Sequence, residues 1–554
     1  MDKVANTIAG PKGSAKILIV DDEKLIRMTM SARLSRAGYE PVAVGDVNEA
    51  VTVLKENPTA FSAIVTDIMM GDMDGFVFRD IVRGIDPSMP IFFLTALDPE
   101  EGSGFLKKIL ADPISYYLPK AVNTEVLIRR VRQIVASRRV QRFIDQKMEE
   151  DRKSMELAAH VQRSMLPTRM VRTRFGFYTT FWRPKEIVSG DLYEAIRFGN
   201  GTCLYVLGDI QGHGTSAALA MTAVQSFIRH LATADSDTDM RPSAIANKMH
   251  QFFRASLADV SYMTALICLH NAKDYEVRWI SCGVDDPLVL DMGKVLPVNP
   301  EKRGGMPVGL MPDTVYTEKD EVLTKLSESA VVIAFTDGIL DISRDEEGLE
   351  QLPREMLNGI CAELADEARY RGTLCPLPHK IIAICAERGY NVFHDDVTAL
   401  VFGNALNLDG IYQAAVPLNP ERIDRAVPDL SKWCCERGLS DNFAYRLQTV
   451  MEEKLMNIHD HGFDERDRLR EAVGLRLQVF EKEARLTVWD YGTQEPSMIV
   501  AAGDASTAFE LVNREMGGHG RGRLMVRELC SGIERNRYGI LNETIYHIPL
   551  EAKA

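Results

Sequence analysis

The chain has 554 residues, more than one hydrophobic core usually organises, and this length predicts three or four domains. Its 79 acidic side chains outnumber 65 basic ones, and the formal charge of −14 argues against a nucleic-acid or anionic-membrane partner. Nine cysteines without a C-x-x-C pair are typical of free thiols in a reducing compartment. The apolar runs are only strand-length, and the tail 1–14 lacks a secretory apolar segment, so we expect a cytoplasmic protein.

Residues 15–137 alternate short apolar runs with helical patterns. This rhythm predicts a doubly wound α/β sheet whose site lies at the carboxyl ends of parallel strands. The four runs expected to form buried strands are Ile17–Val20, Ala63–Thr66, Ile91–Thr95 and Tyr116–Leu118.

A stretch without glycine or proline runs from about Glu125 to Leu166, and its segment 138–168 is the expected helical linker. Residues at alternating steps of four and three form an a/d seam: Ile144, Met148, Asp151, Met155, Ala158, Gln162 and Met165. Asp151 and Gln162 interrupt this seam. A weak two-stranded coil, which would make a homodimer, and an ordinary amphipathic helix therefore remain equal alternatives.

The rest of the chain divides into a strand-rich region, 169–403, and a last α/β region, 410–552, with a polar break between them. The helices expected in these regions are Thr215–Leu231, Pro242–Leu257 and Asp441–His461, and the expected C-terminal strands are Gly474–Val479 and Ala484–Asp490. A DNA-binding regulator is disfavoured, because no helix-turn-helix follows the first domain.

Polar side chains gather at the strand ends of the first region. Asp21 and Asp22 follow its first strand, Asp67 and Thr95 end later strands, and Lys120 follows the last. Strand ends meet at one edge of a parallel sheet, so these residues can converge. Three clustered carboxylates favour a cation such as Mg²⁺, and one of them can then attack a phosphoryl donor.

The motifs VDD, TD, LTA and YLPK resemble the receiver domain of two-component response regulators over residues 15–137. The resemblance implies that Asp67 accepts a phosphoryl group and that a cognate histidine kinase is a partner. It implies these further roles: Asp21, Asp22, Asp67 and the Met69 carbonyl hold Mg²⁺, and Thr95, Tyr117 and Lys120 sense the phosphoryl group. Ala121 departs from the proline that the family usually has after the lysine.

Aspartates recur in the middle region, in SGD (Asp191), GDIQGHG (Asp209), FTDG (Asp337) and HDDVT (Asp395 and Asp396). Any one Asp-Gly is more often a turn than a ligand. Together, a carboxylate-rich set suits Mg²⁺ or Mn²⁺, and two such ions can activate a water toward phosphorus. The neighbouring glycines 212 and 214 are expected to let the backbone approach the carboxylates closely.

These motifs, with AAHVQRSMLP and GGMPVGL, resemble the PPM-type serine phosphatases of the sporulation and stress-response branch over about 155–402. The resemblance implies a β-sandwich flanked by helices, with two Mn²⁺ or Mg²⁺ ions. The resemblance implies that Asp209 bridges both ions, helped by the Ile210 carbonyl, and that Asp337 and Asp395 complete the shell of one ion. It further implies that Asp191 acts through a bound water or as a further ligand. His213 would orient the loop or the substrate. The departures from the family pattern are Gln211, Val284 and Asp341. His160 is interpreted as a packing or solvent-facing residue, because no acidic residue adjoins it.

The helix VMEEKLMNIHDHGF places Glu453 and Asn457 one turn apart, DYG follows a strand, and GGHGRGR (517–523) precedes a helical run. Backbone N–H groups of such a glycine-rich segment can cradle phosphates. Region 410–552 resembles the GHKL-type serine kinases that act as anti-sigma factors, with an α/β-sandwich fold and ATP/Mg²⁺ as ligand. The resemblance implies that Glu453 is the base and that Asn457 binds Mg²⁺. Asp490, at the DYG turn with Gly492, would contact the adenine. The lid would contain Gly518, Gly520 and Gly522. Gln494 departs from the pattern, in place of a second glycine.

The sequence thus predicts a multidomain response regulator whose phosphatase acts on a phosphoserine or phosphothreonine of an anti-sigma-factor antagonist-like protein. The C-terminal module is expected to phosphorylate such an antagonist or to bind a sigma factor. Two alternatives remain: a phosphatase with a non-catalytic C-terminal binding module, and a non-enzymatic scaffold.

Overall fold

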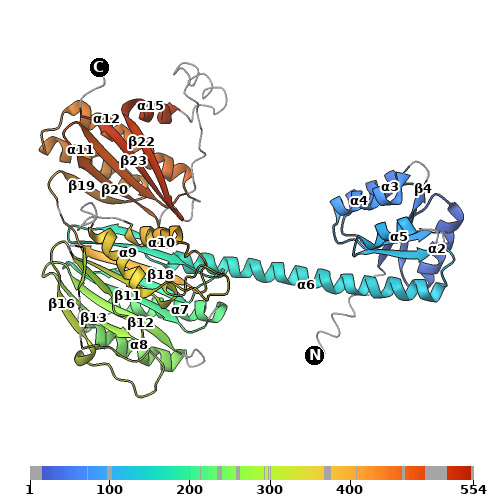
Figure 1. Ribbon diagram of the computed structural model, residues 1–554, viewed down its shortest axis with the longest axis horizontal. Helices are drawn as coiled ribbons and strands as arrows, with labels where there is room; N and C mark the ends of the chain where they lie inside the picture. Colours follow the sequence, from blue (N-terminus) through green and yellow to red (C-terminus); the bar gives the residue numbers. More distant parts are fainter. Residues whose placement is uncertain are drawn as a thin grey trace. The chain divides into compact units, whose positions relative to one another are not determined.

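Buried β-branched and aromatic runs form the first domain, as their continuous apolar character predicts for a parallel sheet covered on both faces. The computed structural model describes residues 15–550 apart from 71–72, 96–102, 199, 213, 234–239, 258–261, 292, 297–298, 300, 367–375, 407, 464–467, 469 and 493–520. The chain divides into two compact units, 1–154 and 155–554, which are described separately (Figure 1). Within the described residues, no helix has the length and apolar character that a membrane crossing requires.

The first unit has a parallel five-stranded sheet in the order β2-β1-β3-β6-β7. Its strands are β1 (Lys16–Val20), β2 (Glu40–Val44), β3 (Phe61–Asp67), β6 (Ile91–Thr95) and β7 (Ser115–Pro119), with a small β4 (Met69–Met70) and β5 (Met73–Asp74) pair after β3. Its helices are α2 (Lys24–Arg36), α3 (Val47–Glu56), α4 (Gly75–Ile85), α5 (Ser103–Leu110) and the start of α6 (Thr124–Met165). Separate apolar clusters lie on the two faces of the sheet. The predicted doubly wound fold is confirmed.

Helix α6 has 42 residues and begins and ends within one residue of the predicted bounds. Leu127, Val131 and Val135 on its first turns are buried against the receiver sheet. Farther along, Ile144 and Met148 of the predicted a/d seam are exposed, at 43% and 66%. The later seam residues Ala158 and Gln162 instead pack within the second unit. The seam is therefore not one open stripe, and homodimerisation through it stays a prediction.

The strand-rich region forms two antiparallel sheets packed face to face. One sheet contains β10 (Asp191–Arg197), β11 (Thr202–Ile210), β12 (Met263–Asn271), β13 (Glu276–Cys282) and β16 (Val322–Lys325). The other contains β15 (Lys294–Leu296), β14 (Leu288–Asp291), β17 (Val331–Phe335), β18 (Val397–Asn404), β9 (Gly176–Arg183) and β8 (Met170–Arg172). Helices α7 (Thr215–Thr233) and α8 (Pro242–Ser256) cover the first sheet, and α9 (Arg354–Asp366) and α10 (Leu377–Glu387) cover the second (Figure 1). Short 3-10 turns η1 (Glu318–Asp320) and η2 (Asp337–Ile339) complete the region.

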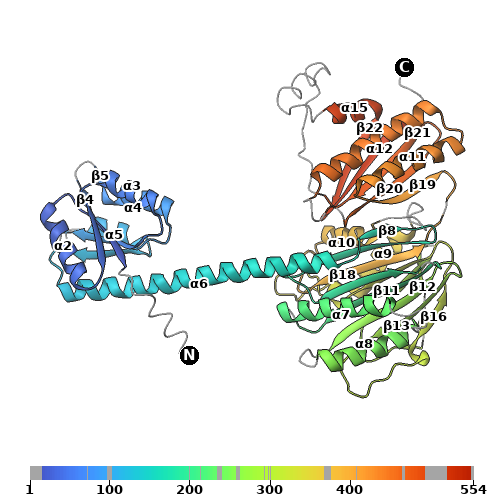
Figure 2. The same cartoon turned by 180° about the vertical axis from the view of Figure 1, so that it is seen from behind.

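The last region has an antiparallel sheet in the order β19-β20-β21-β23-β22, with helices on one face (Figure 2). Its strands are β19 (Ile411–Pro417), β20 (Ala472–Val479), β21 (Glu483–Asp490), β22 (Gly532–Tyr538) and β23 (Leu541–Pro549), and its helices are α11 (Pro420–Glu436), α12 (Asp441–His461) and α15 (Arg521–Leu529). The helical face encloses its own apolar cluster. Trp489, Tyr491 and Leu541 belong instead to the cluster under α9 and α10. The predicted domain boundaries stay predictions.

Candidate functional site

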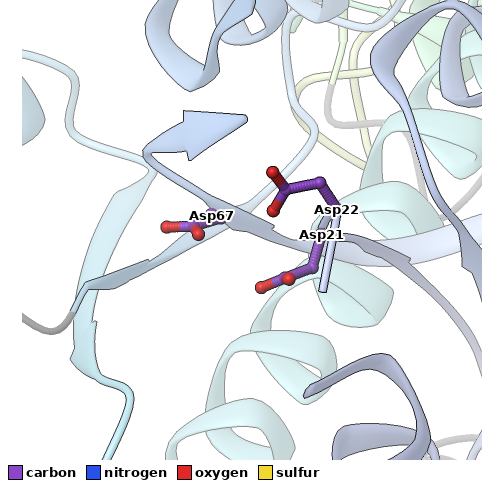
Figure 3. Close-up of side chains that lie close together, drawn as sticks. All are labelled: Asp21, Asp22 and Asp67. Carbon is purple, nitrogen blue, oxygen red and sulfur yellow. The ribbon is translucent and has the colours of Figure 1, made fainter. Parts of the chain in front are cut away.

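The receiver carboxylates converge as the strand ends predicted. One oxygen each of Asp21, Asp22 and Asp67 lies within 4.8 Å of the others (Figure 3). Lys120 Nζ lies 2.6 Å from Asp67 Oδ2 and 3.7 Å from Asp21 Oδ2. Burial raises the pKa of Asp21, and its Oδ2 is a buried atom without a hydrogen-bond partner. An unsatisfied carboxylate oxygen among acidic neighbours fits a hard cation such as Mg²⁺.

The remaining receiver residues lie around this carboxylate group. Thr95 is buried at the end of β6, and its carbonyl accepts a hydrogen bond from Lys120 N at 2.7 Å. This backbone bond holds the lysine in place beside Ala121. Burial opposes the charged form of Lys120, but the hydrogen bond to Asp67 and the charges of Asp67 and Asp21 together outweigh burial and raise the pKa of the lysine. Met69 lies in β4 just past Asp67, and Tyr117 is half-buried on β7.

The phosphatase aspartates come from three separate strand ends: Asp209 from β11, Asp337 just after β17 and Asp395 just before β18. Burial, then the charges of Asp337 and Asp395, raise the pKa of Asp209 to about 7. Burial and Asp395 raise the pKa of Asp337, and burial raises that of Asp395. They are near enough to repel one another, which fits a site for divalent cations.

Among the described residues, however, these three do not gather as tightly as the receiver group, which alone places one ligand atom of each residue within 4.8 Å of the others. Ligands shared between two ions need not all touch one another, since the ions themselves stand about 3.5–4 Å apart. Gly338 explains the TDG motif: a Cβ there would collide with the Asp396 carbonyl oxygen. A glycine is therefore required where these two loops meet.

Asp191 is fully buried behind Asp209, directly opposite it in the β10–β11 register. Its Oδ2 accepts hydrogen bonds from Thr336 Oγ1 at 2.8 Å and Thr398 Oγ1 at 2.6 Å. Burial, then the charge of Asp209, raise its pKa well above the ordinary value. These contacts hold the Asp191 carboxylate in place, and its predicted role at the ions stays a prediction.

Asp396 has a role that sequence reasoning missed. Its carboxylate accepts hydrogen bonds from Lys185 N, Ser189 Oγ and Gly190 N, at 2.7, 2.8 and 2.7 Å. It thereby ties the HDD loop to the SGD loop that carries Asp191. The paired aspartates of the motif were the available signal, but spacing does not tell which of the two makes this loop contact.

Gln162 of α6 was also missed as a site residue. Its Nε2 donates to Ser189 O at 2.6 Å, and its Oε1 accepts from Ser189 N at 3.1 Å. The linker helix is therefore hydrogen-bonded to the SGD loop. One expectation was wrong: a Cβ at Gly212 or Gly214 would meet nothing within 4 Å. Their φ values of +110° and +76° explain these glycines instead.

The other phosphatase predictions are placed as follows. The Ile210 backbone adjoins the SGD loop, with its N–H 3.4 Å from Gly190 O. Asp341 accepts a hydrogen bond from Gln351 and adds negative charge near Asp337. Val284 packs against the core between the sheets. His213 lies outside the described residues.

The C-terminal candidate site joins α12 to the end of β21. Asn457 Nδ2 donates to Glu453 Oε1 at 2.9 Å. Asp490 Oδ1 accepts from Gly492 N at 3.0 Å and from Asn542 Nδ2 at 2.8 Å. Asp490 Oδ2 is buried without a hydrogen-bond partner, although Lys454 Nζ lies 3.6 Å away. A buried orphan acceptor fits the amino group of adenine.

Glycine also matters at this site. A Cβ on Gly492 would lie 3.0 Å from both Gly462 Cα and Gly462 O, so a larger residue would crowd the backbone between the strand end and α12. Gly522, predicted for the lid, lies in the first turn of α15. Gly518, Gly520 and Gln494 lie outside the described residues. Asn542, which orients Asp490, had no sequence signal.

Comparison with family models matches three segments of the chain. Residues 17–132 match the response regulator receiver domain, 199–403 match stage II sporulation protein E, and 416–543 match a histidine kinase-like ATPase domain. The chain combines these three domains in that order. The match to stage II sporulation protein E begins after Asp191, so it does not include that residue.

Individual relatives resemble parts of the chain. The transcriptional regulatory protein YvrH of Bacillus subtilis is 38% identical over 122 residues, which are 22% of this chain and 48% of that protein. The SiaA-PP2C domain of Pseudomonas aeruginosa is 22% identical, with a TM-score of 0.38, over 46% of this chain and 98% of that one. The RsbU and RsbW domains of Rv1364c from Mycobacterium tuberculosis are 16% identical, with a TM-score of 0.36, over 70% and 98%. The chain covers about half or less of the first curated relatives.

Proposed function

We propose that the protein is a metal-dependent protein serine/threonine phosphatase controlled by phosphorylation of its receiver domain. The observation that carries the proposal is the mutual proximity of Asp209, Asp337 and Asp395: burial raises all three pKa values, and the charge of Asp395 adds to the shifts of Asp209 and Asp337. Carboxylates close enough to repel one another are unfavourable unless protons or cations neutralise them. The match of 199–403 to a sporulation phosphatase supports the same reading.

The chain's own residues divide the work of the phosphatase site. Asp209, Asp337 and Asp395 would hold the cations, and Asp191 with its two threonine donors supports Asp209 from behind. Asp396 fixes the loop that precedes Asp191. Divalent cations, when bound, supply a water of lowered pKa for attack on phosphorus.

Control by the receiver is proposed to run through α6. Asp67 accepts the phosphoryl group, and Lys120 and Thr95 respond to it, because both lie at the same edge of the receiver sheet. The Gln162–Ser189 hydrogen bonds give the helix a direct hold on the phosphatase loops. A regulator acts only if its two states bind or pack differently. The Gln162 contact is a place where the packing of the two states can differ.

The C-terminal domain is proposed to bind ATP with Mg²⁺, with adenine at Asp490 and the Glu453–Asn457 pair beside the phosphates. The likeness to a protein titled as RsbU and RsbW domains suggests the class of partner. We propose an anti-sigma-factor antagonist-like phosphoprotein as the substrate of the phosphatase. The same antagonist, or a sigma factor, is the proposed partner of the ATPase domain.

The test is Mn²⁺-dependent dephosphorylation of a phosphoserine antagonist-like protein by the full chain, with and without a small phosphoryl donor for Asp67. Asp209→Asn and Asp337→Asn should each abolish the activity, whereas Asp274→Asn in the exposed β12–β13 turn should leave it intact. Unchanged hydrolysis in both site variants would eliminate the proposed metal centre, and a wild-type chain without activity would favour the scaffold alternative. Calorimetric titration of the full chain with MgADP tests the ATPase domain: without saturable binding, the C-terminal domain is a protein-binding module.

A further inference from the structure

Strand β21 presents its last residues to two different sites. Side chains alternate between the two faces of a strand. Trp489 and Tyr491 enter the apolar cluster under α10 of the phosphatase region, whereas Asp490 lies on the opposite face, at the nucleotide site. In the register with β23, Trp489 faces Glu543 and Asp490 faces Asn542. The Trp489–Glu543 pair therefore lines the contact with the phosphatase region, and the adjacent Asp490–Asn542 pair lines the nucleotide site.

A buried ion pair connects β23 to α10. Lys380 Nζ on α10 lies 2.9 Å from Glu543 Oε1, and the two side chains are only 5% and 6% exposed. Trp489 Nε1 donates to the same oxygen at 2.9 Å. Burial opposes the charge of Glu543, but Lys380 and the hydrogen-bond donors outweigh it and lower the pKa to about 2. The charged pair is present although both side chains are almost fully buried.

Glu543 is held on every side. Its second oxygen accepts from Asn536 Nδ2 at 2.9 Å and from Tyr538 OH at 3.2 Å, and Lys380 also lies over the Tyr538 ring. A buried ion pair contributes little net stability compared with apolar residues, but it fixes geometry when all of its partners are satisfied. Its contribution here is the position of β23 against α10.

We propose that Lys380 of the phosphatase domain is a positioning residue for the nucleotide site of the ATPase domain. Lys380 fixes Glu543, and the adjacent Asn542 holds Asp490 Oδ1. Asp490 Oδ2, which has no hydrogen-bond partner among the described residues and lies 3.6 Å from Lys454 Nζ, would accept from the base. The ligand class is an adenine nucleotide. The inference rests on the nucleotide binding proposed above and adds that its affinity depends on the phosphatase domain.

Coupling of this kind is reciprocal. If the α10 contact strengthens nucleotide binding by some factor, nucleotide strengthens the α10 contact by the same factor. We therefore expect MgADP to slow amide hydrogen exchange in α10, because Lys380 and its neighbours Leu377, His379 and Ile381 are buried at this contact. This readout does not depend on catalysis.

The experiment compares MgADP affinity of full-length variants by calorimetry, well below their unfolding temperatures. Lys380→Met should weaken binding at least about fivefold, the lower range of measured site-to-site coupling. Arg388→Met is the matched control: Arg388 follows the same helix, but its partner Glu363 lies within the phosphatase region. It should bind as the wild type does.

Lys380→Met alone leaves a buried carboxylate without its cation and could unfold the contact. The double variant Lys380→Met/Glu543→Gln removes that charge while keeping an acceptor for Trp489. It should fold, bind MgADP at least about fivefold more weakly and lose the nucleotide-dependent protection of α10. Wild-type affinity in the folded double variant overturns the inference but leaves nucleotide binding standing. A wild-type chain without binding overturns both.

Discussion

Asp209→Asn should stabilise the metal-free protein above neutral pH and abolish its stabilisation by Mn²⁺. The pKa of Asp209 is raised from 3.8 to about 7, mainly by burial and then by Asp337 and Asp395. A carboxyl whose pKa is higher in the folded chain binds its proton more tightly there. Its contribution to stability is therefore complete below about pH 4 and is lost as the pH rises through about 7.

The size of the effect follows from about 1.4 kcal/mol for each tenfold change in proton affinity. Relative to an Asp209 that stays protonated, the free energy of unfolding is lower by up to about 4 kcal/mol at about pH 8, where the folded carboxyl is ionised. At about pH 5, where only the unfolded chain has released this proton, it is lower by about 2 kcal/mol. Asparagine does not ionise, so the variant should gain most of this difference at the higher pH.

The assay is urea unfolding of the full chain in EDTA at both pH values, followed by tryptophan fluorescence, with Trp182 and Trp279 buried in the phosphatase sheets. Added Mn²⁺ should raise the wild-type transition, because a ligand bound only by the folded state stabilises it, and should barely move that of the variant. Asp274→Asn serves as the control for a surface aspartate. Equal stability of wild type and Asp209→Asn at both pH values would refute the reasoning.

Further substitutions separate the loops from the linker and the receiver. Asp396→Asn should weaken Mn²⁺ binding about 10–100-fold, measured by calorimetry, because it loosens the loop before Asp191 without removing a presumed ligand. Gln162→Leu should destabilise the phosphatase by about 1–3 kcal/mol in urea unfolding, since the backbone N–H and C=O of Ser189 both lose their partner. The exposed Gln141→Leu on the same helix should not. Lys120→Met should leave basal dephosphorylation unchanged and remove its response to a phosphoryl donor; an intact response contradicts the switch.

The sequence was sufficient to predict helices with a single apolar face and strands that are apolar throughout. Helix α12 matches its predicted bounds, because a serine N-cap at 440 begins it and one apolar face packs on its own sheet. The first-domain strands were found since they are apolar throughout. Strand β2 (EPVAV) was missed, because it is an edge strand with only Val44 buried.

Helix α10 was missed for the opposite reason. Leu377, His379, Lys380, Ile381 and Cys385 are all buried, since the phosphatase sheet lies on one side of the helix and the C-terminal sheet on another. A helix buried on several sides has no 3.6-residue apolar period to detect. A method based on sequence pattern assigns a lysine in such a segment to an exposed position, because it has no knowledge of the distant partner Glu543.

Candidate site residues follow the same division. The carboxylates that precede or follow apolar strands, Asp67 and Asp209 among them, were found because strand ends converge at one edge of a sheet. Residues that act through a hydrogen bond to a distant segment were not found: Gln162 meets Ser189, and Asn542 lies 50 residues beyond Gly492, whose carbonyl it also contacts at 2.9 Å. No local pattern records such contacts.

The alternation of β21 also limits how this chain can change. Trp489 and Asp490 are neighbours on one backbone, so a shift that repacks Trp489 against α10 necessarily moves Asp490 at the nucleotide site. A one-residue slip would exchange the two faces and place an aspartate in the apolar cluster. The ion pair at Glu543 opposes such a slip, because only one register brings its carboxylate to both Lys380 and Trp489. The ion pair therefore selects one strand register, whereas apolar side chains alone would permit several registers.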